Sequence, residues 1–143
     1  MKRRRVIFIL HIISLIDLSL NICSFAMNTG FSTSEPDEKK QQDFLAGNAI
    51  SLTYEEPKKH IISCFDVSES GLVAVGSSTY GNQYIYVYDA TGKFQYGYAF
   101  NNPGSYGLQW DGSDLIIYFV RSDIAALVDS TGNIKELKVI DDT

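Results

Sequence analysis

The chain has 143 residues, enough for one modest domain, and 13% of them are aromatic, too many for an intrinsically disordered protein. Its net charge is −5, but residues 1–26 hold Lys2, Arg3, Arg4 and Arg5 and a single acid, so the remainder is strongly acidic. An acidic body excludes nucleic-acid binding, which needs clustered lysine and arginine.

Residues 1–26 have the layout of a secretory signal peptide. A basic start precedes an apolar stretch from Val6 to Ile16, and small residues at Ser24 and Ala26 suit cleavage after Ala26. The alternative is an uncleaved apolar helix that anchors the chain through residues 6–26, with its N-terminus in the cytoplasm. Asp17, near the middle of that span, opposes this alternative. In both cases we expect an extracytoplasmic body, either secreted or anchored to the membrane.

Residues 27–48 read as a polar linker that contains a short helix. The linker begins as a flexible spacer, and Ser34 followed by Asp37 resembles a capping box. Gly47 is placed to end the helix. We therefore predict a helix from about Glu35 to Ala46.

From residue 49 onward, runs of β-branched and aromatic residues alternate with Gly, Asn, Asp and Ser, a pattern typical of short strands and turns. The pattern predicts nine strands. They cover residues 49–55, 61–67, 72–77, 84–88, 94–100, 106–110, 115–121, 124–129 and 134–140.

The segment from Tyr84 to Phe100 is echoed by Ile124 to Ile140, about 40 residues on. Both copies contain Asp-x-Thr-Gly at the turn, from Asp89 to Gly92 and from Asp129 to Gly132. Asp at the first position and Gly at the fourth suit a type I turn in a tight hairpin. We expect this hairpin to pair three sets of aromatic residues, which are Tyr88 with Phe94, Tyr86 with Tyr96, and Tyr84 with Tyr98.

The preceding segments align too, since FDVSESGLVAVG from Phe65 matches LQWDGSDLIIYF from Leu108. Two such units, residues 49–100 and 101–143, resemble blades of bacterial extracytoplasmic β-propellers of the NHL and WD40-like kind. The resemblance rests on the pattern Ile-x-Val-Tyr-Asp-x-x-Gly-x-Phe from Ile85 to Phe94. It implies an all-β fold of two consecutive four-stranded antiparallel propeller-like blades. Trp110-Asp111 does not stand where WD40 blades keep that dipeptide.

Two blades are fewer than the roughly four to eight that close a propeller. Three explanations follow. The chain is a truncated propeller, or several copies associate through exposed blade faces, or it is a small open sheet or sandwich that only resembles blades.

The candidate site is the tyrosine group Tyr84, Tyr86, Tyr88, Tyr96 and Tyr98, which forms either a stacking platform for a glycan or peptide or an inter-blade packing surface. No nucleophile motif or phosphate loop occurs, so the sequence predicts no catalytic residue and no cofactor. His60 and Cys64 have helical spacing in a predicted strand, which argues against zinc. Asp111, Asp114 and Asp123 read as turn residues, and Cys64 as a buried core thiol.

The sequence therefore predicts a non-enzymatic, extracytoplasmic binding or scaffold module that recognises protein or glycan. The alternatives are a fragment of an exported propeller enzyme, whose catalytic residues lie on missing blades, and a remnant without independent function.

Overall fold

The computed structural model describes residues 27–57, 61–79 and 81–141. The predicted signal peptide or anchor, and His60, lie outside these ranges. Within them the chain is mostly β, with one helix of ten residues, α2 (Glu38–Gly47). The described part has the predicted all-β class.

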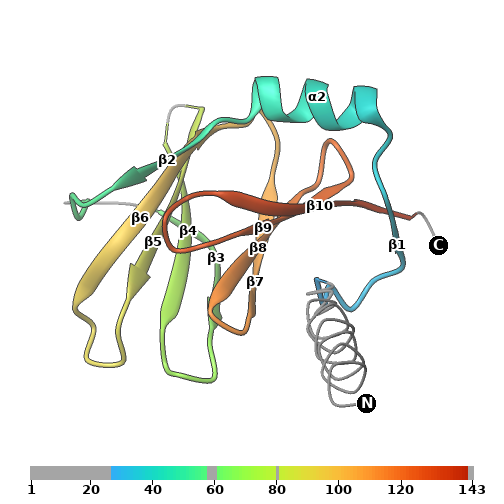
Figure 1. Cartoon of the computed structure of the whole chain (residues 1–143). Coiled ribbons are helices and arrows are strands. Elements are labelled where there is room, and N and C mark those ends of the chain that lie inside the picture. Colours follow the sequence, from blue (N-terminus) through green and yellow to red (C-terminus); the bar gives the residue numbers. More distant parts are fainter. Residues whose placement is uncertain (1–26, 58–60, 80, 142–143) are drawn as a thin grey trace, which may run out of the picture.

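The strands of the described ranges form two antiparallel sheets of five strands each (Figure 1). The N-sheet has the order β2-β6-β5-β4-β3, and the C-sheet has the order β1-β10-β9-β8-β7. Each sheet is a meander of four consecutive strands with one earlier strand added at its edge. The strands are β1 (Thr33–Ser34), β2 (Ile50–Thr53), β3 (Ile62–Val67), β4 (Val73–Thr79), β5 (Asn82–Tyr88), β6 (Phe94–Asn101), β7 (Tyr106–Asp111), β8 (Asp114–Phe119), β9 (Ile124–Val128) and β10 (Ile134–Ile140).

The nine predicted strands correspond to β2 through β10, with differences of a few residues at their ends. These strands follow local patterns, in which apolar β-formers are interrupted by turn residues. The short strand β1 was not predicted. It pairs with β10, more than 100 residues away in the chain, and nothing local indicates that pairing.

The predicted helix forms, but it begins at Glu38, three residues later than predicted, and the predicted cap is wrong. Asp37 is the N-cap, and its carboxylate accepts a hydrogen bond from the Lys40 amide at 2.7 Å. Ser34 instead belongs to β1, and its hydroxyl donates to Asp141 at 2.7 Å. Asp37 and Ser34 are both good capping residues, and the strand pairing of β1 decides between them.

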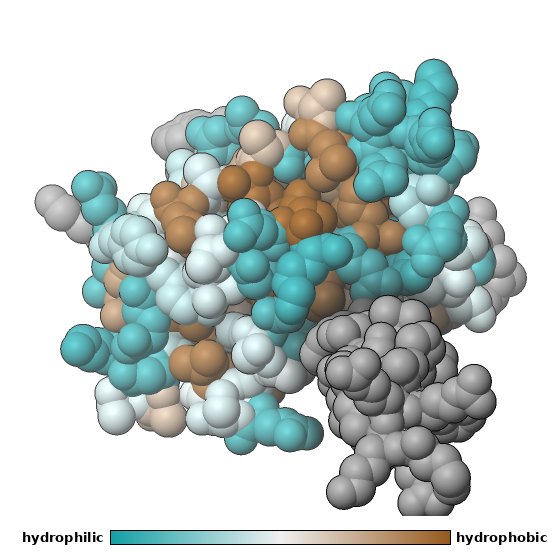
Figure 2. All heavy atoms as spheres, in the orientation of Figure 1, coloured by the Kyte–Doolittle hydropathy of each residue, from teal (hydrophilic) through white to brown (hydrophobic). Residues whose placement is uncertain are grey.

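The predicted flexible spacer is incorporated into the fold. The chain runs along the edge of the C-sheet as β1, passes above the C-sheet as α2, and then joins the edge of the N-sheet as β2 (Figure 1). In the same view, hydrophilic residues dominate one end of α2, and hydrophobic residues gather below it (Figure 2). The segment thus links the outer edges of the two sheets.

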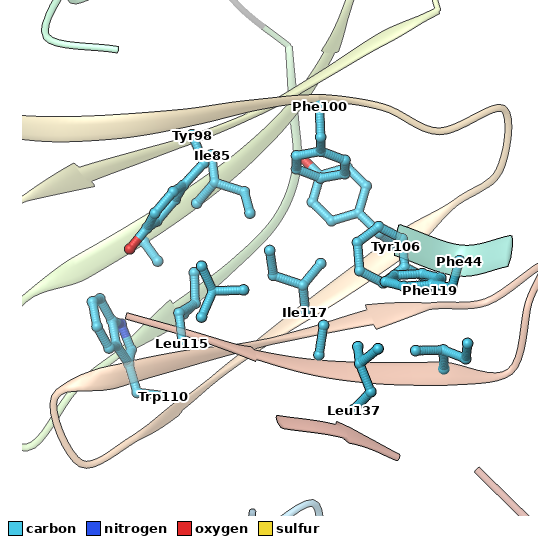
Figure 3. Packing of buried hydrophobic residues seen from close by; sticks show 14 of the residues in the cluster. Phe44, Ile85, Tyr98, Phe100, Tyr106, Trp110, Leu115, Ile117, Phe119 and Leu137 are labelled. Carbon is cyan, nitrogen blue, oxygen red and sulfur yellow. The ribbon is translucent and has the colours of Figure 1, made fainter. Parts of the chain in front are cut away.

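The main hydrophobic core lies between the facing sides of the two sheets (Figure 3). At one edge β3 lies beside β7, where the Asp66 carboxylate accepts from the Trp110 amide at 2.7 Å. At the other side Phe44, from α2, packs edge-on against Phe119 at 4.9 Å between ring centroids. The core side chains are Phe44, Ala74, Ile85, Val87, Tyr98, Phe100, Tyr106, Trp110, Leu115, Ile117, Phe119, Ile124, Ala126, Val128 and Leu137.

Candidate functional site

The two Asp-x-Thr-Gly turns have nearly identical geometry. The Gly92 amide donates to the Asp89 carbonyl at 2.9 Å, and the corresponding Gly132 to Asp129 distance is 3.0 Å. Both glycines have positive φ, 82° and 85°. Each aspartate carboxylate accepts hydrogen bonds from the hydroxyl and the amide of the threonine two residues on, and from the amide of the residue after the glycine. These bonds lower the pKa of the aspartate, and the bond from the threonine hydroxyl has the largest effect. These hydrogen bonds all lie within one hairpin or the other, so they define the turns.

A β-bulge after the first turn changes the expected pairing of the tyrosines. Phe94 pairs with Tyr88 as predicted, but the register then shifts by one residue, and Tyr96 pairs with Val87. The predicted pairs of Tyr86 with Tyr96 and Tyr84 with Tyr98 are therefore wrong. Because side chains alternate between faces with a period of two, a one-residue shift moves every later β6 side chain to the other face.

Two of the five candidate tyrosines, Tyr96 and Tyr98, consequently face the C-sheet. Tyr98 is 1% exposed, and its hydroxyl donates to the Asp129 carbonyl at 2.8 Å. Burial strongly raises the pKa of Tyr98. Tyr98 thus ties the first repeat to the turn of the second, and it is not on the surface that carries the other three tyrosines.

The remaining three, Tyr84, Tyr86 and Tyr88, lie on the opposite side of β5, which we call the outer face of the N-sheet. The rings of Tyr84 and Tyr86 are stacked, with centroids 5.9 Å apart and planes inclined by 7°. Phe94 meets Tyr88 edge-on at 5.8 Å. Tyr86 is buried, whereas Tyr84, Tyr88 and Phe94 are half-buried. The candidate platform is therefore a row of three tyrosines and Phe94.

Two exposed hydrophobic residues of the edge strand β3 extend this face. Phe65 pairs with Val75 and Val67 with Val73, and those β4 residues pair in turn with Tyr86 and Tyr88, so all six share one side of the sheet. Phe65 is 67% exposed and Val67 is 52% exposed. The sequence singles out the tyrosines but not Phe65 and Val67, because the alternation of residues in an edge strand with one exposed side does not differ from that in a half-buried strand.

The strand registers define which residues of the two repeats are equivalent. The offset between repeats is 43 residues in the first strand of the meander, 42 in the second and 40 in the third and fourth. Compared with the first repeat, the second repeat is therefore one residue shorter in the turn between its first and second strands. It is two residues shorter in the loop between its second and third strands. The equivalent pairs that establish this are Val67 and Trp110, Val73 and Leu115, and Tyr88 and Val128.

With these offsets, the outer face of the N-sheet is equivalent to the core-facing side of the C-sheet. Trp110, Leu115 and Val128, the counterparts of Val67, Val73 and Tyr88, all lie in the core between the sheets. The core-facing side of the N-sheet is likewise equivalent to the far side of the C-sheet. The two sheets therefore stack head to tail, with the same side of each pointing in the same direction.

The far side of the C-sheet is covered by residues 27–31 of the chain itself. Met27 is 7% exposed and packs with Ile116, Ala125 and Leu127 in a second hydrophobic cluster. Tyr118 donates a hydrogen bond to the Thr29 carbonyl at 2.9 Å. One end of the stack is therefore closed by a short N-terminal segment, and Phe65 and Val67 remain exposed at the other end.

A recess of about 440 Å³ lies near the start of β5 and β7, and its described lining residues are neutral. Gln83 is 6% exposed, and its amide nitrogen donates to the carbonyls of Asn102 and Gly104 at 3.0 and 3.3 Å. Its amide oxygen has no hydrogen-bond partner among the described residues. The recess offers hydrogen bonds but no charge to a ligand. Its lining consists of Ser63, Ser78, Gly81, Gln83, Asn102, Pro103, Gly104, Ser105 and Tyr106.

Cys64 is a half-buried free thiol packed against the main core, and burial raises its pKa. Its sulfur and the Tyr106 hydroxyl occupy the space above Gly76, where an added Cβ would lie 2.4 and 2.8 Å from them. A raised pKa keeps the thiol protonated and weakly nucleophilic. Cys64 is therefore a packing residue.

Among the residues that the structure describes, no group of three or more His, Cys, Asp or Glu side chains is arranged to hold a metal ion. No helix in the same part of the chain has the length and apolar character needed to cross a membrane. Comparison with protein-family models, with curated proteins and with solved structures finds no match to this chain.

Proposed function

We propose that this chain is a non-enzymatic, exported binding module made of two propeller-type blades, and that it binds a partner protein through the outer face of the N-sheet. The observation that carries the proposal is the head-to-tail equivalence of the two sheets. The outer face repeats the side of the C-sheet that is buried against the N-sheet, and its edge residues Phe65 and Val67 remain exposed.

The blade interpretation is supported by several features together. Each repeat is a four-stranded antiparallel meander, the repeats stack in one direction, and β3 lies beside β7, as the first strands of neighbouring blades do around a propeller axis. The additions are β1, α2 and β2, which join the outer edges of the two sheets. They give the pair of blades a covered edge that a bare fragment lacks.

The geometry also indicates what kind of partner fits. Within the chain, the side of the C-sheet that is equivalent to the outer face packs against the core-facing side of the N-sheet, which carries Ala74, Ile85 and Val87. A partner that fits the outer face should therefore offer a similar apolar sheet side. On a second copy, the equivalent side is the far side of the C-sheet, and residues 27–31 already cover that side. We therefore infer that the occupant is a different protein that offers an apolar β-sheet face. Clustered exposed hydrophobic residues are typical of such contacts.

Export is the second part of the proposal and rests on the sequence of residues 1–26. A basic start, an apolar stretch and small residues before Met27 are typical of a secretory signal peptide.

Photo-crosslinking in the producing cell tests the binding surface. The photoreactive residue p-benzoylphenylalanine replaces Phe65 in the full chain, and the control variant carries it at Leu45, which is 42% exposed on α2. We expect a discrete adduct with another protein from position 65 only, through a peptide of a β-strand, and its loss when Val67→Asp is added. Absence of an adduct at position 65 overturns the proposal. An adduct with a second copy shows self-association instead and overturns the assignment of a separate partner.

A further inference from the structure

Met27, where the described structure begins, is held to the C-sheet by its side chain and by its backbone nitrogen. The side chain is 7% exposed and packs against Ile116, Ala125 and Leu127. The nitrogen lies 3.0 Å from the Glu136 carboxylate oxygen Oε2 and donates a hydrogen bond to it. The nitrogen of this one residue therefore faces a carboxylate.

Further charged groups lie beside this contact, on β10, on β7 and at Glu35. On β10, the other oxygen of Glu136, Oε1, lies 3.0 Å from Lys138 Nζ, and Lys138 also pairs with Glu35. On β7, the Asp111 carboxylate accepts a hydrogen bond from the Asn28 amide at 3.1 Å. Two carboxylates thus receive the first two backbone nitrogens of the segment. A neutral amide needs no carboxylate partner, whereas an ammonium group gains substantially from one.

We propose that Glu136 is the receptor for the α-ammonium group created at Met27 by cleavage after Ala26. The inference rests on the export proposed above. Signal peptidase hydrolyses the Ala26–Met27 bond with one water molecule, which leaves a carboxylate on Ala26 and an amine on Met27, and this amine takes up a proton near neutral pH. The neutral N–H···O contact then becomes a charged N⁺–H···O⁻ pair at the same position.

Processing therefore strengthens the cover over the far side of the C-sheet. The new ion pair holds Met27 in its apolar site, and Met27 leads into the segment whose carbonyl at Thr29 accepts from Tyr118. The mature N-terminus becomes a structural element that closes one end of the blade stack, and the uncleaved chain has only the weaker amide contact.

The effect has a defined dependence on pH. An unpaired α-amino group has a pKa of about 7.7–8.0, and a carboxylate partner raises the pKa of the folded state above this value. Stabilisation by the pair is therefore complete below about pH 7.7 and is lost as the pH rises through the folded-state pKa. Lys138, whose pKa its acidic partners raise, remains charged throughout this range.

The first experiment measures the intact mass of the protein recovered after expression of the full chain with export. The expected product begins at Met27. Retention of residues 1–26 overturns both the cleaved form of the export proposal and this inference. Cleavage at another bond overturns this inference alone and leaves export standing.

The second experiment compares the processed wild-type protein with Glu136→Gln, which preserves size and one acceptor oxygen. We expect the ratio of their unfolding constants, variant over wild type, to fall about five- to tenfold between pH 6.5 and 10. Lys138→Met is the matched control, because it removes the neighbouring pair but keeps the ammonium receptor. Its ratio to wild type should change less than twofold over the same range.

A third readout serves if Glu136→Gln does not fold well enough for this comparison. Acetylation of the Met27 amine by an N-hydroxysuccinimide ester at pH 7, followed by peptide mass, should be severalfold slower in the folded wild type than in urea-unfolded wild type. It should also be severalfold slower than in Glu136→Gln if that variant folds. A flat stability ratio, or equal acetylation rates in folded and unfolded protein, overturns the inference.

Discussion

Replacement of Phe44 by alanine tests whether α2 is held to the sheets by a single anchor. Phe44 is 4% exposed, it is the residue of the helix that is buried, and its ring meets Phe119 edge-on at 4.9 Å. A helix of ten residues is marginal in water without tertiary contacts. Loss of this ring should therefore weaken both the core and the docking of the helix.

The magnitude follows from burial and surroundings. Phe→Ala substitutions in cores cost about 3–5 kcal/mol, of which an edge-on aromatic pair accounts for about 0.5–1.5 kcal/mol. A groove of about 410 Å³ lies beside Phe44, between α2 and the β8–β9 turn, so water reaches the vacated space and the helix can shift. We therefore expect a loss near the lower end, about 3 kcal/mol in the free energy of unfolding.

Urea denaturation followed by circular dichroism and by fluorescence of Trp110 measures this loss. With an m-value of about 2 kcal/mol/M, the midpoint should fall by about 1.5 M. Leu45→Ala, at a neighbouring position that is 42% exposed, is the control and should cost less than about 1 kcal/mol. Amide hydrogen exchange should show α2 losing protection before the sheets. Equal costs for the two variants, or unchanged protection in α2, would refute the single-anchor interpretation.

Three further predictions concern packing, turns and ionisation. Gly76→Ala should cost about 1–3 kcal/mol because its Cβ collides with the two side chains above it, whereas Gly47→Ala, with nothing within 4 Å, should be neutral in the same urea assay. Asp129→Ala should cost about 1–2 kcal/mol in the free energy of unfolding, because it removes the side chain that accepts the hydrogen bonds of the turn. In the wild type this stabilisation should be present above about pH 4 and should disappear as the pH falls through the lowered pKa of Asp129. Tyr98 and Tyr106, with pKa values strongly raised by burial, should stay protonated in absorbance titrations at pH values where free tyrosine ionises, and their ionisation should coincide with alkaline unfolding; early titration of all tyrosines would contradict their burial.

The tyrosines of the candidate surface could be predicted from the sequence only in part. The tyrosines of β5 were correctly placed on one face together, because alternation along a single strand is a local property. Their expected partners on β6 were not, because the bulge after Gly92 inserts one residue into the pairing and moves Tyr96 and Tyr98 to the core side. A glycine turn suggests such a bulge, but the sequence does not show how far the shift persists.

The amino-acid sequence by itself determined the strands β2 to β10, the Asp-x-Thr-Gly turns and the presence of the helix, because each of these depends on a pattern of neighbouring residues. The tertiary structure decided which surfaces are open. It placed β1 beside β10, laid Met27 over the C-sheet, and left Phe65 and Val67 exposed at the edge of the N-sheet. These outcomes depend on contacts between residues up to 109 positions apart, such as Met27 with Glu136, and on the direction in which two similar sheets stack. Local pattern predicts which segments become strands, whereas long-range packing selects which side of each strand meets another.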